Sequence, residues 1–453
     1  MAQRKRRSAK TTQSMPVLNP DAAGIDVGAT EVFAAVPQDR SEQPVRSFAT
    51  FTPDLEALAD WFEECHIKTV AMESTGVYWI PLFQILESRG IEVCLVNARH
   101  VKNVPGRKTD VADCQWLQYL HAVGLLRGSF RPPQAICAVR SILRHRDMLV
   151  RYAGSHVQHV QKALNQMNLH LHHVISDITG KTGLAILDAI LAGERDPAKL
   201  AELRDHRIKA EASVIEKALI GDWRDEHLFT LRQALATWRH YQKQIDECDL
   251  EIVQLLASFD PPDDPSASGS RSDQRVASQA VAEPKSLSDH LQRVLGVDLT
   301  EIPGLDTGVI QAVFAEIGRD LSAFPTAKHF ASWLGLCPDN RISGGKVLSV
   351  KTRTVKSRAA TILRLAARSL HHSKTALGDY YRRMRARLGA PKAITAAAHK
   401  LARILYHLIT QRQPYTESVF AKSEQKYQQR RLARLKKEAA TLGFTLVQRH
   451  AVS

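Results

Sequence analysis

Short apolar segments and amphipathic helical patterns alternate in the first third of the chain, in an order that few folds accommodate. Strands are expected at residues 22–27, 32–36, 46–51, 69–72 and 91–96, and helices at 53–64, 78–88 and 110–126. Tight connections join the first strands into an antiparallel meander, and the helices that follow act as crossovers between parallel strands. The sequence therefore predicts a mixed α/β sheet with helices on both faces.

Acidic residues stand at the ends of these expected elements. Asp26 is near the end of the first strand, Glu73 follows the fourth, and Asp110 and Asp113 begin the last helix. An isolated pair at a helix start can also be a cap in a capping-box-like arrangement. Converging carboxylates repel one another unless a divalent cation binds them, and oxygen ligands suit Mg²⁺ or Mn²⁺. The four acids are thus candidate ligands for one or two metal ions, and such ions can act on a phosphodiester.

The charge of the chain indicates a polyanionic partner. There are 62 Lys and Arg residues against 47 Asp and Glu residues, which gives a net charge of +15. This excess favours nucleic acid or an anionic membrane surface, and no apolar run is long enough to span a membrane. Residues 1–20 are expected to be a disordered basic arm, because no apolar core of a secretory signal follows the first cations.

The six cysteines are scattered and include no C-x-x-C pair. This pattern is typical of reduced thiols, and it argues against a disulfide framework or a zinc site. We therefore expect a cytoplasmic protein, associated with the nucleoid through its nucleic-acid partners.

The middle of the chain, residues 128–259, is expected to be helical. Residues 143–167 are basic and amphipathic, and Ile245, Leu250, Val253 and Leu256 recur at helical spacing, which predicts long antiparallel helices or a coiled coil. The histidines of residues 169–173 lack partner ligands at a recognisable metal spacing, so a helix face that touches RNA or solvent is favoured. Residues 260–290, rich in Ser, Asp and Pro, are expected to be a flexible linker.

Two C-terminal motifs suggest contact with phosphate. Residues 301–308 (E-I-P-G-L-D-T-G) resemble a helix-hairpin-helix, but Asp306 replaces the usual second glycine, so a plain helix–helix turn is an equal alternative. Ser343, followed by Gly344 and Gly345, marks a loop where backbone can approach a phosphate closely; a surface hairpin turn is the alternative.

The region around Ser343 is strongly basic. Residues 341–403 contain sixteen Lys and Arg residues and one acid, Asp379, which predicts a phosphate-contacting face on a folded domain with apolar helical seams. The candidate nucleic-acid-binding residues are Arg107, Lys108, Arg341, Lys346, Lys351, Arg353, Lys356 and Arg358.

Taken together, these motifs resemble the DEDD-type transposases of bacterial insertion sequences, also called bridge-RNA-guided serine recombinases. The N-terminal resemblance rests on G-I-D at 24–26, M-E-S-T-G-V-Y at 72–78 and K-T-D-V-A-D at 108–113. The C-terminal resemblance rests on I-P-G at 302–304 and G-L-C-P-D-N-R-I-S-G-G at 335–345. The combination is specific, although each motif alone is weak.

The resemblance implies a ribonuclease H-like, RuvC-like N-terminal domain whose catalytic and metal-binding acids match Asp26, Glu73, Asp110 and Asp113. It also implies a serine nucleophile that matches Ser343. The implied partners are donor and target DNA, a structured guide RNA and further copies of the chain in a tetramer, a dimer of dimers with sites composed from two protomers. A metal-dependent RuvC-like nuclease that uses water, or a non-catalytic nucleic-acid-binding scaffold, remains the alternative.

The expected organisation has six parts. They are the basic arm (1–20), the DEDD domain (21–127), a helical or coiled-coil region (128–259), the linker (260–290), a C-terminal transposase domain with the serine motif (291–415), and a charged helical tail (416–453).

Overall fold

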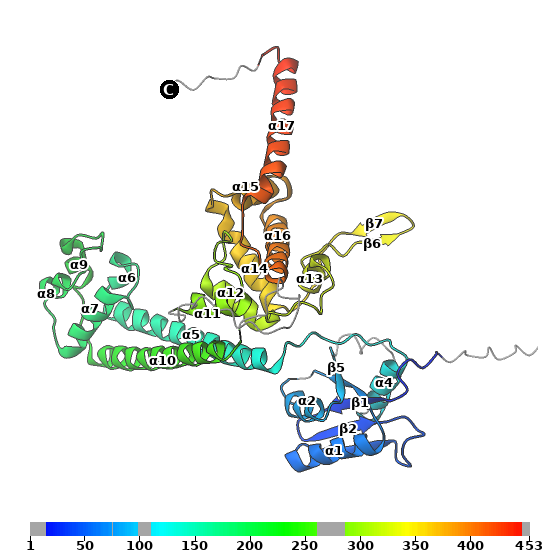
Figure 1. Cartoon of the computed structure of the whole chain (residues 1–453). Coiled ribbons are helices and arrows are strands. Elements are labelled where there is room, and N and C mark those ends of the chain that lie inside the picture. The colour runs from blue at the N-terminus through cyan, green and yellow to red at the C-terminus, as the bar shows by residue number, and fades with distance from the viewer. Residues whose placement is uncertain (1–14, 75, 98–109, 261–285, 446–453) are drawn as a thin grey trace, which may run out of the picture. The chain divides into compact units, whose positions relative to one another are not determined.

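The computed structural model describes residues 15–74, 76–97, 110–260 and 286–445, and the chain divides into two compact units, Met1–Arg131 and Pro132–Ser453. Figure 1 labels their elements. Most of the expected basic arm, most of the expected linker, and Arg107 and Lys108 lie outside the described residues.

The first unit is built on a mixed five-stranded sheet. Its strands are β1 (Ala22–Val27), β2 (Glu31–Ala35), β3 (Val45–Ala49), β4 (Thr69–Glu73) and β5 (Glu92–Val96), in the order β3-β2-β1-β4-β5. The pairs β1–β2 and β2–β3 are antiparallel, whereas β1–β4 and β4–β5 are parallel. The predicted meander with parallel crossovers is confirmed, and the topology agrees with a ribonuclease H-like fold.

Helices cover both faces of this sheet. On one face, Ile25 and Met72 pack in a core with side chains of α1 (Thr52–Glu64) and α2 (Trp79–Ser88). On the other face, Ala71 and Val96 pack against Leu117 of α4 (Asp110–Ala122). Helix α4 ends about one turn before the expected Leu126, because Gly124 adopts a left-handed conformation with φ +71° and turns the chain.

The second unit begins with a long helical arm, seen in Figure 1 as the pair α5 (Gln134–Gln166) and α10 (Asp225–Ala257). Leu149 packs near Ile245, while Leu164 packs in the cluster of Leu231, so the helices run antiparallel as predicted. The expected seam was wrong at Leu250, which is 65% exposed. Leu250 is two residues from both Cys248 and Ile252, which are on the buried side of the helix, so its side chain lies on the opposite side. Four short helices close the arm: α6 (Leu171–Val174), α7 (Lys181–Ala192), α8 (Pro197–Glu202) and α9 (Ala212–Ala218).

A helical body follows the arm. It contains α11 (Leu287–Leu295), α12 (Thr307–Ile317), α13 (Ala327–Trp333), α14 (Arg358–Ser369), η2 (Leu370–His372), α15 (Ala376–Leu388), α16 (Ala390–Gln411) and α17 (Ser418–Thr441). Leu363 and Leu401 are fully buried, so the basic region is a folded domain as expected.

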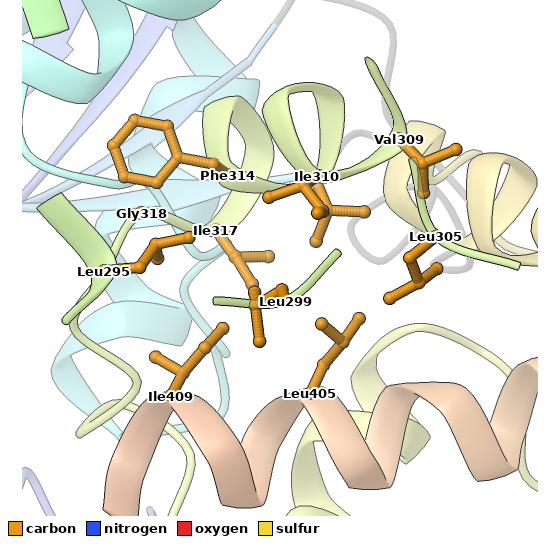
Figure 2. A pocket seen from close by; sticks show the side chains of 11 residues that line it. Leu295, Leu299, Leu305, Val309, Ile310, Phe314, Ile317, Gly318, Leu405 and Ile409 are labelled. Atoms are coloured by element: carbon orange, nitrogen blue, oxygen red, sulfur yellow. The ribbon is translucent and has the colours of Figure 1, made fainter. Parts of the chain in front are cut away.

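Figure 2 shows the small apolar void in the core of this body, whose lining includes Leu305, Phe314 and Leu405. Its volume of about 10 Å³ could hold one water molecule, but an apolar lining offers no hydrogen bonds, so it is a packing defect and not a ligand site.

A two-stranded hairpin of β6 (Arg341–Ser343) and β7 (Lys346–Ser349) separates α13 from α14, and it carries the serine motif (Figure 1). All six cysteines are free thiols, as predicted. None of the described helices combines the length and apolarity needed to cross a membrane.

Candidate active site

Asp26 and Glu73 occupy equivalent positions on adjacent parallel strands. Ile25 of β1 is in register with Met72 of β4, and Asp26 and Glu73 are the next residues on the two strands. Ile25 and Met72 are fully buried on the face covered by α1 and α2. Because side chains alternate along a strand, the two carboxylates lie together on the opposite face, where both residues are half-buried.

Helix α4 crosses that opposite face. Gln118 donates a hydrogen bond of 3.1 Å from Nε2 to the carbonyl of Ala22, and His121 Nε2 shares one of 2.8 Å with Thr69 Oγ1. Ala22 and Thr69 begin their strands, so the last turns of α4 lie over the strand starts. Its first turn is therefore directed toward the strand ends, where Asp26 and Glu73 lie.

A glycine permits this close approach. A Cβ atom on Gly24 would lie 2.2 Å from the backbone N of Gln118 and 2.3 Å from the carbonyl O of Cys114. Such distances exclude any side chain, so α4 rests directly on the β1 backbone. The G-I-D motif thus supplies both the contact with α4 and the carboxylate two residues later on the same face.

Asp26 and Asp113 both act on the Cys114 thiol. Burial raises the pKa of the Cys114 thiol to about 12, and the carboxylates of Asp26 and Asp113 both contribute to the increase. Both acids are therefore within electrostatic reach of one thiol. Asp110 begins α4 one turn earlier, but its side chain lies outside the described part of the structure.

The donor chemistry of this edge fits a hard divalent cation, because Asp26, Glu73 and Asp113 offer only oxygen atoms. Among the described residues, no three acidic, histidine or cysteine side chains are already close enough to hold an ion. Asp26 and Glu73 thus lie at one edge of the sheet, and the first turn of α4 is directed toward it, while the Asp110 side chain and the loop before it lie outside the described part of the structure.

Ser343 lies at the tip of the hairpin, in the other unit. Gly344 and Gly345 have φ angles of +53° and +75°, the combination that a tight two-residue hairpin turn requires. Ser343 pairs with Lys346, and both residues are exposed. The hairpin-turn alternative is therefore the structure that forms, and it leaves Ser343 exposed to solvent just before two residues without side chains.

The two neighbouring serines have local structural roles. Ser349 Oγ accepts a hydrogen bond of 3.3 Å from the backbone N of Lys351. Ser357 is the N-cap of α14 and accepts one of 3.2 Å from Ala360 N. No hydrogen bond to Ser343 Oγ occurs within the described part of the chain.

The predicted nucleic-acid-binding cations have different surroundings. Lys346, Lys351 and Lys356 are exposed, whereas Arg353 donates a 2.6 Å hydrogen bond to the carbonyl of Ser332. Arg358 binds Asp147 and lies 3.8 Å from Glu316, so its charge is already compensated within the protein. The Arg341 side chain lies outside the described residues, as do Arg107 and Lys108.

The I-P-G turn is a packed connection between helices. Gly304 has φ +89°, and a Cβ atom there would lie 3.0 Å from the carbonyl of Ala366 in α14. Asp306 caps α12 by accepting a 2.8 Å hydrogen bond from Val309 N. These contacts favour the plain helix–helix turn over a phosphate-binding hairpin.

The histidine group of residues 170–173 is a ring cluster. The His172 and His173 rings lie 4.3 Å apart, and His170 stacks on His173 at 5.0 Å. Among the described residues, no group of His, Cys, Asp or Glu side chains is placed to hold a metal ion.

Gln118 and His121, which position α4, were not identified from the sequence. They share a helix face with Cys114, and this stripe of polar residues on a helix expected to cover a sheet was the available signal. Arg364 and Arg403, which lie near the base of the serine hairpin, were also missed, because they were counted within the general excess of charge.

Two family models match the chain. A model of DEDD-type IS110 transposases matches residues 23–169, and a model of transposases of the IS116/IS110/IS902 family matches residues 298–382. The matches support an IS110-type transposase. They imply a DNA-processing enzyme with DNA substrates, and their spans contain the four acids and Ser343. No functionally curated protein matches the chain.

Proposed function

We propose that this transposase cleaves and rejoins DNA strands through a covalent serine–DNA intermediate. Ser343 is the nucleophile, and Asp26, Glu73, Asp110 and Asp113 are the ligands of Mg²⁺ or Mn²⁺. The observation that carries the proposal is the direction of α4, which runs back along β1 and β4 and so brings Asp113 toward Asp26 and Glu73.

The serine step conserves a phosphate ester bond. Ser343 Oγ forms a bond to the phosphorus, the bond from phosphorus to the bridging oxygen of the neighbouring nucleotide breaks, and that strand leaves with a 3′-hydroxyl that receives a proton. Attack of a 3′-hydroxyl on the phosphoserine reverses the step and frees the serine. A bound divalent cation would polarise the phosphate and offset its charge.

The hairpin suits this role sterically. Cβ atoms built on Gly344 and Gly345 would meet nothing within 4 Å, so the turn is open on both sides. A phosphate can therefore approach the Ser343 hydroxyl without displacing other parts of this chain.

Guidance by a structured RNA and assembly as a tetramer belong to the same proposal. They rest on the family resemblance, and the net charge of +15 supports a nucleic-acid partner beyond the DNA itself. Sequence-specific recombination by protein freed of all RNA would refute RNA guidance, and sequencing the RNA that copurifies would identify the guide.

Substitution of Ser343 tests the nucleophile. The wild type should form a protein–DNA adduct that survives a denaturing gel, and Ser343→Ala should bind DNA yet form none. Ser349→Ala is the matched control, because it removes one hydroxyl from the same hairpin, and its adduct should persist. An adduct in Ser343→Ala, or one that maps to Ser349 or Ser357, would refute the assignment.

A second candidate function is a metal-dependent nuclease that uses water. It is favoured by one observation: the first unit contains all four acids, and such chemistry needs no serine. Continued cleavage without any adduct, in the wild type and in Ser343→Ala alike, would establish this function instead. If the wild type binds nucleic acid but never cleaves DNA, the protein is a non-catalytic nucleic-acid-binding scaffold.

A further inference from the structure

Arginines surround the segment that leads from α13 into the serine hairpin. Arg353, just after β7, donates from Nη2 to the carbonyl of Ser332 (2.6 Å), and Arg364 of α14 donates from Nη2 to the carbonyl of Gly335 (3.4 Å). Arg353 and Arg403 of α16 both lie near Cys337. Burial raises the pKa of the Cys337 thiol, and the charges of the two arginines lower it. We call Arg353, Arg364 and Arg403 the hairpin-base arginines.

The base of the hairpin is fixed by backbone contacts. Pro338 and Thr352 form an isolated antiparallel bridge, and Asp339 N donates a 2.9 Å hydrogen bond to the carbonyl of Lys351. A Cβ atom on Gly335 would lie 2.4 Å from Val355, so the two sides of the base are in tight contact. The hairpin-base arginines are therefore attached to a defined part of the body, and Ser343 lies at the other end of the same hairpin.

No carboxylate neutralises these arginines within the described residues. None of the three forms an ion pair there, and Arg403 Nε is buried without a hydrogen-bond partner. Arg403 also lies near other cationic groups. Burial is the main cause that lowers the pKa of His399 and of Lys400, and the charge of Arg403 lowers both pKa values further. Positive charge is thus concentrated here at a cost to the folded protein.

Other arginines of the same unit are compensated. Glu316 binds Arg144 through both carboxylate oxygens at 2.9 and 3.0 Å, and Arg146 forms a two-bond pair with Asp249 at 2.6 and 2.9 Å. These two arginines have acidic partners, whereas Arg293 of the same unit donates to the backbone carbonyls of Phe259, Leu256 and Ala257. Hairpin-base arginines that use a single N–H on a carbonyl retain most of their five donors for a ligand.

Phosphate is the ligand that such a group fits. The planar guanidinium donates two parallel hydrogen bonds to phosphate oxygens, and three converging cations suit a polyanion better than a single carboxylate.

We propose that the hairpin-base arginines bind the backbone phosphate of a nucleic-acid strand and hold that strand beside the hairpin that carries Ser343. The inference rests on the proposed function of the chain as a nucleic-acid enzyme. It goes further by assigning positioning roles to Arg364 and Arg403, which lie outside the hairpin.

Salt-dependent binding by the full-length protein tests the proposal. Binding of a labelled DNA duplex and of a labelled RNA hairpin would be measured across salt concentrations for the wild type, Arg403→Gln, Arg403→Lys and Arg364→Gln. Lys209→Gln is the control, because Lys209 is an exposed cation of the same unit that lies outside residues 341–403, and its substitution removes the same charge. Thermal unfolding of each variant shows whether the fold is retained.

Arg403→Gln and Arg364→Gln should each bind about tenfold more weakly and flatten the log–log salt slope by about one unit, while Arg403→Lys keeps the wild-type slope. Whether the variants lose affinity for the DNA duplex or for the RNA hairpin identifies the kind of strand that the hairpin-base arginines bind. If both Gln variants are folded and bind as tightly as Lys209→Gln, the proposal is wrong. The Ser343 adduct of the wild type is measured independently of these binding constants. If the adduct forms but the Gln variants bind normally, only the role of the hairpin-base arginines is refuted. If the wild type neither forms the adduct nor binds nucleic acid, the proposed function is refuted as well.

Discussion

Gly24 of β1 and Gln118 of α4 approach so closely that a Cβ atom on the glycine would lie 2.2 Å from the backbone N of the glutamine. Gly24→Ala should therefore push α4 away from the sheet and lower the free energy of unfolding by about 1–3 kcal/mol. DNA cleavage should fall further than stability, because Asp113 moves with α4. Chemical denaturation and a cleavage assay would measure the two effects.

Gly154→Ala is the matched control for that change. Gly154 lies within α5, where a Cβ atom would meet nothing within 4 Å, so alanine should stabilise the helix by about 0.5–1 kcal/mol. Equal stability of Gly24→Ala and the wild type would contradict the contact between β1 and α4.

Asp113→Asn removes one charge from the acidic edge while keeping the size of the side chain. We expect cleavage to fall by about a hundredfold or more, with DNA binding retained, because the amide is a poor ligand for a hard cation. The same loss should follow when excess chelator is added to the wild type, and Mg²⁺ or Mn²⁺ should restore it.

Asp39→Asn is the control, because Asp39 is an exposed loop acid of the same unit whose nearest cation, Arg40, lies at 3.8 Å. Full cleavage by Asp113→Asn, or by the wild type in chelator, would show that the four acids do not act through a metal.

Glu316 connects the arm to the helical body. Its side chain is only 14% exposed, and it binds Arg144 of α5 through both oxygens, with Arg358 of α14 at 3.8 Å. Glu316→Gln should lower the free energy of unfolding of the full chain by about 1–3 kcal/mol, because it removes the carboxylate that faces Arg144 and the largely buried Arg140.

The pair of Arg239 and Asp188 provides the comparison. Both side chains are about half exposed, so Asp188→Asn should cost less than about 1 kcal/mol. Denaturation curves that show similar losses for the two substitutions would mean that the Glu316 contacts are no stronger than a surface ion pair.

The buried thiol of Cys114 predicts a dependence on pH. Its pKa is about 12 in the folded protein, above the ordinary value of 9.0, so the folded state holds the proton more tightly than the unfolded state does. Stability should therefore be complete below about pH 9 and decline as the pH rises toward 12. Cys114→Ala should flatten this decline, and unfolding measured at several pH values between these limits would show it. The same slope in both proteins would contradict the assignment.

The sheet and its order could be predicted because alternation and turn residues are local signals. Each strand was placed within about one residue of its observed position, and the acids Asp26 and Glu73 were placed at strand ends. The direction of α4 was not predictable, since it depends on Gly24 and on the polar contacts of Gln118 and His121 across the sheet, which no periodicity encodes.

Side-chain pairing was also beyond the sequence. Arg358 was predicted to contact nucleic acid, yet it binds Asp147, a residue of the distant helix α5. Conversely, Arg364 and Arg403 looked like ordinary members of a basic stretch, and only the fold brings them toward the carbonyls and the thiol at the base of the hairpin. Net charge shows how many cations a region contains, but which of them remain for a ligand depends on tertiary contacts.

The antiparallel course of α4 also has a consequence for the timing of folding. Asp26 is in the first strand of the sheet, whereas Asp113 is in the last helix of the first unit, so their meeting closes nearly the whole length of that unit. Contacts of such long sequence separation form late and slowly. A nascent chain that has not yet produced α4 can build the strands but lacks half of the acids. Under the proposed mechanism, the ability to cut DNA therefore arises only after the first unit is complete.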